Sequence, residues 1–509
     1  MIRRWCLPIL LCLPILALAG AGAAPDQSLP VDLSLEGETL VLDNGMTFIL
    51  LPRTGAPVFS GHIAFEVGSL DTVPGQTGVA HMFEHMVFKG TRHIGTTDWE
   101  KERPLLEALQ KTGDRLTLLK ATGEGTDEEI ARLEAELARL NEAQHAYIVK
   151  DEVDRIYSEA GGRGFNASTG TDYTRYFVSL PSNELELWML IESQRIREPV
   201  LREFFSERDV VFEERRMRND NHPVGKLFEH FTATAFLAHP YRLSPIGWAS
   251  DILALTQSGT EVFFHEYCAP SNAVGVLCGN FDTARAKSLI YKYFGSIPAR
   301  DDPPPVVTKE PPQEAERRVS VVFEANPMMM VGFHKPAWPH EDDLSMDLIQ
   351  VILTDGVTSR LYRRMVEGDG SVFVIQAING VPGTRCDNLF AFLAVLSGSA
   401  TYEEVEAALY EELDRLKSEP VSEAELEKAK TRILSGLIHQ WARPDDAASL
   451  AATYQFITGD WRSMEDYLRD IQRVRPEDII EAARTYFTRE NRTVAHLVKP
   501  AEPEKEVGQ

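Results

Sequence analysis

His81-Met82-Phe83-Glu84-His85 is the stretch of this 509-residue chain that most strongly constrains its fold. Positions i, i+3 and i+4 share one face of an α-helix, so a helix here sets two imidazoles and one carboxylate side by side. The segment Gly75 to Gly78 is typical of the turn before a helix, and Gly90 of the position where one ends. The spacing therefore predicts a short helix with one chemically reactive face.

The same five residues form the pattern H-x-x-E-H, the reverse of the commoner H-E-x-x-H zinc signature. On this interpretation His81 and His85 bind one metal ion, and Glu84 takes a proton from the water that the ion activates. The alternative is an amphipathic helix whose histidines are satisfied core or surface groups. Partial copies of the pattern lack one His each and predict no further zinc site: Phe228-Glu229-His230, His265-Glu266 and His340-Glu341.

A hydrolytic zinc site needs three protein ligands and one open position for water, so a third donor must come from another element. The acidic stretch from Ser206 to Arg218 is the candidate, because Glu207 and Glu214 share one face of a helix there. Taken alone, an acidic stripe mixed with valines is typical of a solvated helix edge beside a packed one.

Several motifs in sequential order resemble one known family. The segment from His81 to Thr91 resembles the active-site helix of the pitrilysin-type (M16) zinc peptidases, in the branch of mitochondrial processing peptidase and its bacterial relatives. Further segments resemble later parts of that family: Asn166–Thr169, Asp172–Thr174, Glu207–Glu214, His239–Tyr241, Pro245–Gly247, Tyr267–Asn272 and Ser359–Tyr362. The likeness extends from about residue 38 to residue 498.

The resemblance implies a zinc-dependent metalloendopeptidase that hydrolyses extended peptides or unfolded polypeptide segments through a metal-activated water. It implies one Zn²⁺ per chain, held by His81, His85 and Glu214, with Glu84 as the general base. Glu207 is then expected to orient a ligating imidazole and to raise its basicity.

Two further expectations concern the neighbourhood of this site. The offset of seven residues from Glu207 favours Glu214 over Glu213 as the third ligand. The resemblance also implies that Asn166, Ala167 and Ser168 pair with the substrate backbone as an added strand, which gives affinity with little side-chain specificity. The alternative for Asn166 is a turn residue.

Many members of the family that this chain resembles place an Arg and a Tyr, seven residues apart, in the second domain to stabilise the oxyanion. The corresponding positions here are Val366 and Phe373, which cannot donate a hydrogen bond. We therefore expect a homo- or heterodimer in which a related subunit supplies the Arg/Tyr pair. Arg360 or Tyr362 is the alternative source.

A second function from another class is a non-catalytic, zinc-binding or scaffolding subunit of a heteromeric peptidase. The intact His81, Glu84 and His85 argue against it. A small-molecule metallohydrolase fits less well, because nothing in the sequence marks a compact substrate pocket. The formal net charge of −25 argues against a nucleic-acid partner and mildly favours cationic or unstructured peptides.

The N-terminus has the features of a secretory signal peptide. Arg3 and Arg4 precede an apolar run from Leu7 to Leu18, and Ala21-Gly22-Ala23 supplies a cleavage site. The run contains two prolines and is short for a membrane span, although an uncleaved anchor is the alternative. We therefore expect residues 1–23 to be removed and the chain to be periplasmic, with no stable membrane span.

The length of the chain predicts two to four domains. We expect a zinc-binding peptidase domain over residues 24–300, a Pro-rich linker over 301–316 and an inactive repeat over 317–509. The fold class is α+β. The resemblance implies two similar α/β-sandwich domains, each an antiparallel sheet with helices, that form a clamshell around an extended peptide.

Local patterns place several elements. Asn44-Gly45 between two apolar runs predicts a β-hairpin over residues 38–52. Residues of about 98–160 predict an inserted antiparallel helical hairpin, whose second helix opens with a capping box from Thr126 to Glu129. We favour a passive surface elaboration, and the alternative is a lid or partner-docking arm.

Cys268, Cys278 and Cys386 remain after signal removal, and their number and spacing predict neither a disulfide framework nor a cysteine zinc site.

Overall fold

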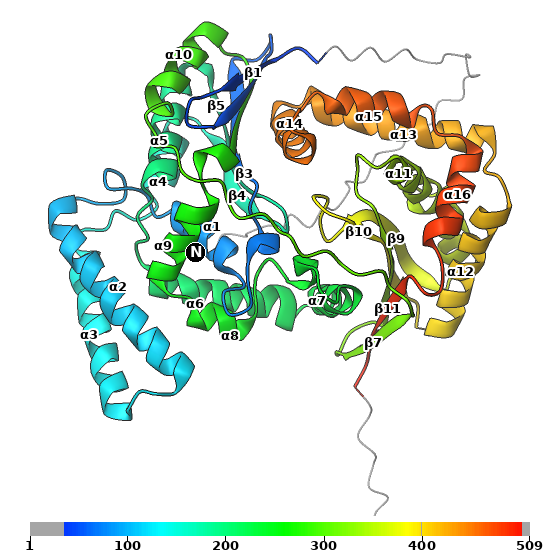
Figure 1. Ribbon diagram of the computed structural model, residues 1–509, viewed down its shortest axis with the longest axis horizontal. Helices are drawn as coiled ribbons and strands as arrows, with labels where there is room; N and C mark the ends of the chain where they lie inside the picture. Colours follow the sequence, from blue (N-terminus) through cyan, green and yellow to red (C-terminus); the bar gives the residue numbers. More distant parts are fainter. Residues whose placement is uncertain (1–34, 399, 501–509) are drawn as a thin grey trace, which may run out of the picture. The chain divides into compact units, whose positions relative to one another are not determined.

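A hairpin begins the described part of the fold. In the computed structural model, which describes residues 35–398 and 400–500, β1 (Glu38–Val41) pairs antiparallel with β2 (Thr47–Pro52) (Figure 1). Gly45 in the connecting turn has a φ of 88°, which a residue without a Cβ adopts at little cost. The hairpin expected over residues 38–52 is confirmed. The predicted signal peptide lies outside the described residues.

The first half contains a six-stranded sheet in the order β1-β2-β6-β3-β5-β4. Its other strands are β3 (Val58–Phe65), β4 (Arg163–Thr169), β5 (Thr174–Pro181) and β6 (Ala273–Gly279). The pair β2–β6 is parallel and the other pairs are antiparallel. The expected α+β fold, an antiparallel sheet with helices, is confirmed, apart from the parallel pairing of β2 with β6. These two strands are not joined by a tight turn, because a long helical segment separates them along the chain.

Helices pack on this sheet around one hydrophobic core. The helices of the first half outside the insertion are α1 (Val79–Val87), α5 (Leu185–Arg197), α6 (Phe204–Arg215), α7 (Pro223–Ala235), α8 (Ala249–Ala254), α9 (Gln257–Tyr267) and α10 (Thr283–Tyr293). Short turns of helix are η1 (Ser69–Asp71), η2 (Ser182–Glu184), η3 (Arg216–Asp220), η4 (Pro240–Arg242) and η5 (Pro270–Asn272). The helix predicted from the glycine boundaries is α1.

The predicted insertion is confirmed as a helical hairpin, α2 (Trp99–Thr122) and α3 (Asp127–His145), followed by a short third helix, α4 (Glu152–Glu159) (Figure 1). Leu116, Leu119 and Leu133 form a small core of their own between α2 and α3. Only half of the expected capping box forms. The Thr126 side chain accepts from the Glu129 backbone N–H, whereas the Glu129 carboxylate accepts from Arg115 on α2.

The second half repeats the plan with a five-stranded sheet in the order β7-β11-β8-β10-β9. Its strands are β7 (Arg317–Val322), β8 (Met328–Lys335), β9 (Val372–Val381), β10 (Asn388–Leu396) and β11 (Arg492–Val498), and its helices are α11 (Glu341–Thr354), α12 (Tyr402–Ser418), α13 (Glu423–Ala442), α14 (Pro444–Thr458), α15 (Ser463–Ile471), α16 (Pro476–Tyr486) and η6 (Tyr362–Gly368). In each half a strand leads to a helix and then to a hairpin at the sheet edge, so the architecture is two similar α/β units.

The two halves exchange helices. From the first half, α7 packs on β7, β8 and β11 of the second sheet, where Phe231 lies against Gly332 so closely that a Cβ there would approach the ring to 2.5 Å. From the second half, α14 packs on β3 and β6 of the first sheet, where Asp445 lies 2.9 Å from His62. The chain from Glu36 onward is accordingly one compact unit, and the predicted domain boundaries stay predictions.

The predicted Pro-rich linker over residues 301–316 contains no helix or strand. It is tied down, because the carboxylate of Glu310 accepts hydrogen bonds from the backbone N–H groups of Leu237, Ala238 and His239 at 2.7–3.0 Å. This anchoring holds the connection along the end of α7.

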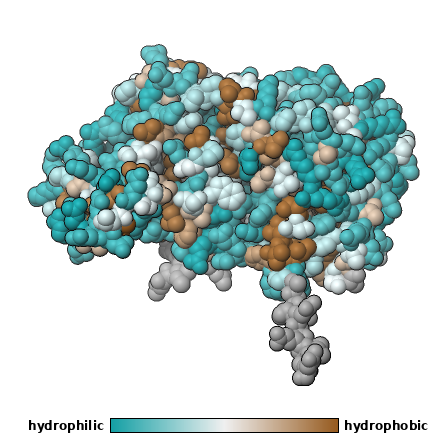
Figure 2. Space-filling model, turned by 60° about the horizontal axis from the view of Figure 1, so that its bottom comes forward, coloured by the Kyte–Doolittle hydropathy of each residue, from teal (hydrophilic) through white to brown (hydrophobic). Residues whose placement is uncertain are grey.

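The surface is mostly hydrophilic in the view of Figure 2, including the helical insertion at its left, in keeping with the formal charge of −25. None of the helices in residues 35–398 and 400–500 is long and apolar enough to cross a membrane. Cys268, Cys278 and Cys386 are free thiols.

Candidate metal centre

The start of α1 is fixed by its turn. Gly78 at the N-cap has a φ of 87°, and a Cβ there would come within 2.6 Å of the Ile246 carbonyl oxygen. The Asp251 carboxylate accepts hydrogen bonds from the Gly75 N–H (2.9 Å) and the Thr77 hydroxyl (2.7 Å). The turn and α8 therefore hold the first residue of α1 in one place, which sets where its polar face points.

The other supporting helix, α6, packs against α1. The side chains of Phe204 and Val211 form the face of α6 that is buried in the hydrophobic core. At its end, the buried Arg215 binds the Glu229 carboxylate (2.8 Å) on α7 and the carbonyl of Gly247. Glu229 belongs to the partial motif Phe228-Glu229-His230, and in the structure its carboxylate is buried in an ion pair with Arg215.

Three side chains converge between α1 and α6. Oε2 of Glu214 lies 3.4 Å from Nε2 of His85 and 3.7 Å from Nε2 of His81, and one donor atom from each residue lies within 4.8 Å of the others. A tetrahedral zinc ion with bonds of about 2.1 Å separates its ligand atoms by about 3.4 Å, so the donor set fits such an ion. Within the described ranges, this is the one group of His, Cys, Asp and Glu side chains with that capacity.

Glu213 takes the opposite direction from Glu214. Its side chain is 61% exposed and binds Arg216 at 2.9 Å. Glu214 instead faces the histidines, and its second oxygen binds Arg218 at 2.5 Å. The seven-residue offset from Glu207 thus identified the carboxylate that faces inward.

Glu207 links the imidazole of His85 to a lysine. Its Oε1 lies 2.9 Å from Nδ1 of His85, and its Oε2 lies 2.6 Å from Nζ of Lys89, which also approaches Glu203 at 3.5 Å. Sequence reasoning missed Lys89, although it lies four residues after His85 on the same helix face. His81 differs from His85, because its buried Nδ1 has no hydrogen-bond partner in the described part of the chain.

Glu84 is buried beside the histidines, and its carboxylate binds a side chain on β4, the edge strand of the sheet. Its Oε2 accepts a hydrogen bond from the hydroxyl of Thr169 on β4 at 2.6 Å. Thr169 was not predicted as a site residue, although it ends the Asn-Ala-Ser-Thr segment that carried part of the resemblance. Its hydroxyl fixes one of the two carboxylate oxygens of Glu84.

Burial and neighbouring charges shift the pKa values of the two histidines in this cluster in opposite directions. Burial, with the charge of His85, lowers the pKa of His81 to about 3. Burial also disfavours the protonated form of His85. The hydrogen bonds of His85 to Glu207 and Glu214 outweigh this effect and raise the pKa of His85 to about 9.

The carboxylates respond to the same forces. Burial raises the pKa of Glu84. Burial also acts to raise the pKa of Glu207 and of Glu214, but hydrogen bonds to His85 and the positive charges nearby bring each to about 2. Two carboxylates therefore stay ionised around the imidazoles, which is the electrostatic setting that a divalent cation requires.

Asn166, Ala167 and Ser168 lie in β4, so Asn166 is a strand residue and the turn interpretation is wrong. β4 pairs with β5 on one side, and among the described strands none pairs with its other side. α1 packs on β4, which places this free edge next to the cluster. An exposed edge presents unpaired N–H and C=O groups to an extended chain.

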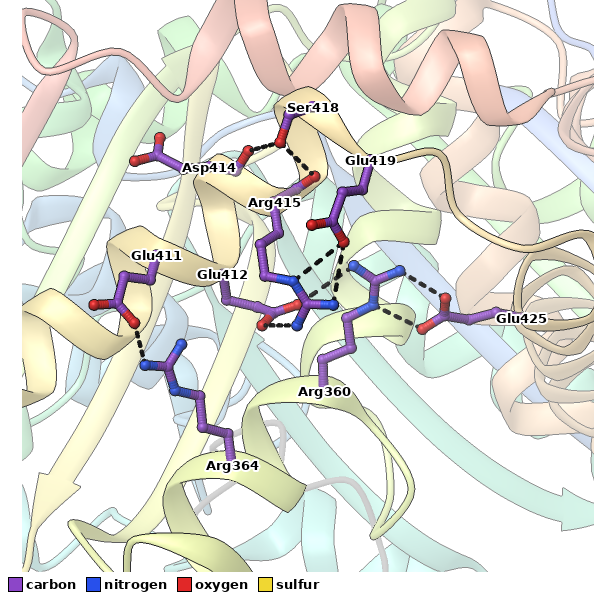
Figure 3. Close-up of polar contacts among 9 residues, drawn as sticks. All are labelled: Arg360, Arg364, Glu411, Glu412, Asp414, Arg415, Ser418, Glu419 and Glu425. Atoms are coloured by element: carbon purple, nitrogen blue, oxygen red, sulfur yellow. Dashed lines mark hydrogen bonds and ion pairs between the residues drawn. The ribbon is translucent and has the colours of Figure 1, made fainter.

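The positions expected for an oxyanion pair lie in the second half. Val366 belongs to η6, and the side chain of Phe373 on β9 is 61% exposed. Of the two alternative donors, Arg360 and Tyr362, the first is occupied: the Arg360 guanidinium binds Glu425 at 2.7 and 2.8 Å and Glu412 at 3.3 Å (Figure 3). Figure 3 shows it inside a network of arginines and glutamates that ties the segment before β9 to α12 and α13.

Comparisons with known proteins agree with this architecture. A family model described as "Peptidase M16 inactive domain" matches residues 261–433, a range that excludes the cluster between α1 and α6. Zinc protease PqqE of Helicobacter pylori is 27% identical over 472 residues, which cover 91% of this chain and 93% of that protein.

Solved structures give the same result. A crystal structure of a protease from Helicobacter pylori has a TM-score of 0.76 at 26% identity and covers 91% of this chain and 99% of its own. The first half of the periplasmic protease PqqL from Escherichia coli has a TM-score of 0.66 at 17% identity, covering 91% and 92%, and shows a likeness of fold. The chain is thus similar to the M16 peptidases: its residues 261–433 match that family's inactive-domain model, its relatives are zinc proteases, and it shares their two-unit fold.

Proposed function

We propose that the chain is a zinc-dependent endopeptidase, with one Zn²⁺ held by His81, His85 and Glu214, that hydrolyses extended peptides or unfolded polypeptide segments. The observation that carries the proposal is the convergence of three ligand atoms within 4.8 Å, with the carboxylate of Glu84 beside them. The name of the Helicobacter pylori relative, a zinc protease, supports the choice of metal.

Glu84 acts as the general base. When bound, the zinc ion supplies Lewis-acid chemistry toward the scissile carbonyl. The Thr169 hydroxyl binds Oε2 of Glu84, so Oε1 takes the proton of the attacking water and later returns it to the leaving amine. Burial raises the pKa of Glu84, which makes its carboxylate a stronger proton acceptor near neutral pH.

The substrate binds as an added strand. An extended peptide pairs with the free edge of β4 through the backbone of Asn166, Ala167 and Ser168. Main-chain pairing selects an unfolded conformation rather than one side chain. Glu207 holds the imidazole of His85 in place through the 2.9 Å contact with Nδ1 while the peptide binds.

We place the mature chain in the periplasm, with residues 1–23 removed as a signal peptide. The Escherichia coli structural neighbour is named as a periplasmic protease. We further propose a homo- or heterodimer in which a related subunit supplies the Arg/Tyr pair, because Val366 and Phe373 cannot donate to an oxyanion.

Replacing Glu84 tests the proposal. Glu84→Gln should bind zinc with the wild-type stoichiometry and lose peptidase activity by a factor of about 10³ or more, because the proton acceptor is gone. Glu213→Gln is the matched control, since its side chain points to solvent, and should keep full activity. The measurements are metal content and cleavage of a peptide library, with and without any co-purified subunit. Unchanged cleavage by Glu84→Gln would favour the scaffolding subunit instead.

A further inference from the structure

A cavity of about 460 Å³ lies in the second half, bordered by α11, α13, α14 and β9. α11 follows β8 as α1 follows β3, and β9 is the edge strand of its sheet as β4 is of the first. α11 also packs on β9, as α1 packs on β4. The cavity therefore occupies the position in the second half that the proposed metal site occupies in the first.

Carboxylates of α11 form one wall. Asp343, Asp347 and Gln350 lie at positions i, i+4 and i+7, on one helix face, and all three line the cavity. From β9, the side-chain amide of Asn379 donates to Asp343 (3.0 Å) and to Asp347 (2.9 Å). This contact between edge strand and helix carboxylate parallels that of Thr169 with Glu84 in the first half.

The cavity is not a second metal centre. It contains no histidine, and the buried ammonium of Lys335 binds Asp343. A lysine in that position supplies the positive charge that an ion would otherwise bring. The residues at the corresponding place thus form a different kind of polar site.

Two buried amide oxygens at this cavity have no hydrogen-bond donor within the described ranges. Asn388 is 1% exposed, and its Nδ2 donates to the Cys386 carbonyl at 3.1 Å, which leaves Oδ1 unpaired. Oδ1 of Asn379 is unpaired in the same way, because its Nδ2 binds the two carboxylates. A buried acceptor without a donor destabilises the fold, and a ligand with N–H groups would supply the missing donor.

The charge of the lining favours a cation. Asp343, Asp347 and Asp355 line the cavity together with Lys335 and Arg432, so carboxylates exceed basic groups by one. Lys335 pairs with Asp343 and Arg432 pairs with Asp355, whereas the two oxygens of Asp347 accept only neutral donors, from Asn379 and from Tyr467 (2.7 Å). Acceptors therefore predominate, and burial with the charge of Asp343 raises the pKa of Asp347 to about 6, a shift that a cation bound beside this carboxylate would reverse.

An aromatic and aliphatic wall completes the cavity. The ring of Trp338 lies 5.5 Å from that of Tyr454 and 6.2 Å from that of Tyr467, and Leu437 and Leu450 also line the cavity. Aromatic faces attract an organic cation, and the aliphatic side chains suit its carbon stem.

We propose that this cavity binds an organic cation with an alkyl stem and an ammonium or guanidinium head, such as lysine or arginine. The head group donates to Asn379, Asn388 and Asp347, and the stem lies against Trp338. The site does not depend on the proposed peptidase activity, because none of its residues belongs to the cluster between α1 and α6.

Calorimetric titration of the full chain tests this site and distinguishes a free ligand from a peptide side chain. The probes are free arginine, N-acetyl-arginine amide and a blocked Gly-Arg-Gly peptide, with N-acetyl-norleucine amide as the uncharged control. We expect at least one arginine probe to bind and the norleucine probe to show no binding. Binding of the blocked peptide assigns the cation to a polypeptide, and binding of free arginine alone assigns it to a small molecule.

Two variants remove the site by different routes. Gly436 lines the cavity from α13, and a Cβ there meets no atom within 4 Å, so Gly436→Leu fills the space while favouring the helix. Asp347→Asn removes the carboxylate that would bind the cation, with little change of shape. Each should weaken arginine binding by about tenfold or more, whereas Asp414→Asn on the exposed face of α12 should not. Absence of binding to the wild-type chain at millimolar probe, or equal binding by wild type and Gly436→Leu, would overturn the proposal.

Discussion

Nδ1 of His85 lies 2.9 Å from Oε1 of Glu207 on α6, and Glu214 lies about two turns further along the same face of that helix. This contact fixes which imidazole nitrogen points toward Glu214. In metal sites, such a partner determines the tautomer and the orientation of the ligand.

Glu207→Gln should therefore lower zinc affinity by about 10–100-fold, because the carboxylate no longer holds His85 or offsets its charge. Peptidase activity should return when zinc is supplied in excess. Competition with a chromogenic chelator measures the affinity. A variant with unchanged affinity would mean that the Glu207 contact is merely structural.

Thr169→Val should lower kcat by about tenfold with no loss of bound metal, because Oε2 of Glu84 loses the hydroxyl that orients it. Valine keeps the shape of threonine and its preference for a strand. Thr169→Ser retains the hydroxyl and serves as the matched control, with activity close to wild type. Equal activity of the valine and serine variants would remove Thr169 from the site.

Gly78 and Gly75 form a matched pair for testing the turn before α1. Both have positive φ, of 87° and 90°, so alanine costs about 1–2 kcal/mol at either position. A Cβ at Gly78 also meets the Ile246 carbonyl oxygen at 2.6 Å, whereas a Cβ at Gly75 meets nothing within 4 Å. Gly78→Ala should therefore lower the free energy of unfolding more than Gly75→Ala. Urea unfolding measures the free energy of unfolding of both variants. Equal losses of that free energy would contradict the steric clash predicted for a Cβ at Gly78.

We expect the carboxyl group of Glu406 to contribute to the pH dependence of the free energy of unfolding. Burial opposes ionisation, but hydrogen bonds from His496 (2.8 Å) and Arg318 (2.6 and 2.9 Å) outweigh it and hold the pKa of Glu406 well below its usual range. A carboxyl with a depressed folded-state pKa stabilises the fold above its unfolded pKa and loses this contribution as pH falls.

Between pH 6 and pH 4, the wild-type free energy of unfolding should thus fall by about 1 kcal/mol more than that of Glu406→Gln. Glu411→Gln, at an exposed carboxyl of the same helix, is the control and should follow the wild type. Parallel pH profiles for wild type and Glu406→Gln would show that the carboxylate contributes no such linkage.

The sequence allowed the site helix and its donors to be predicted because both depend on local spacing. The glycines at 78 and 90 bound α1, and the spacing of His81 and His85 along one helix requires no knowledge of tertiary contacts. The inward direction of Glu214 followed from its seven-residue offset to Glu207 on α6. These inferences needed only helical periodicity.

Features that depend on pairing across long sequence separations could not be predicted. Thr169 reaches Glu84 across 85 residues, and the parallel pairing of β2 with β6 joins segments more than two hundred residues apart. The exchange of α7 and α14 between the sheets is of the same kind, because an apolar helix face does not specify which sheet covers it. Phe231 indicates a buried helix, but only the fold shows that Gly332 lies beneath it.

Zinc titration of wild type, Glu214→Gln and Glu213→Gln tests the central claim most directly. We predict one zinc ion per wild-type chain, unchanged affinity for Glu213→Gln, and an affinity lower by at least about a hundredfold for Glu214→Gln. Retained tight binding by Glu214→Gln would contradict the assignment of Glu214, His81 and His85 as one metal centre.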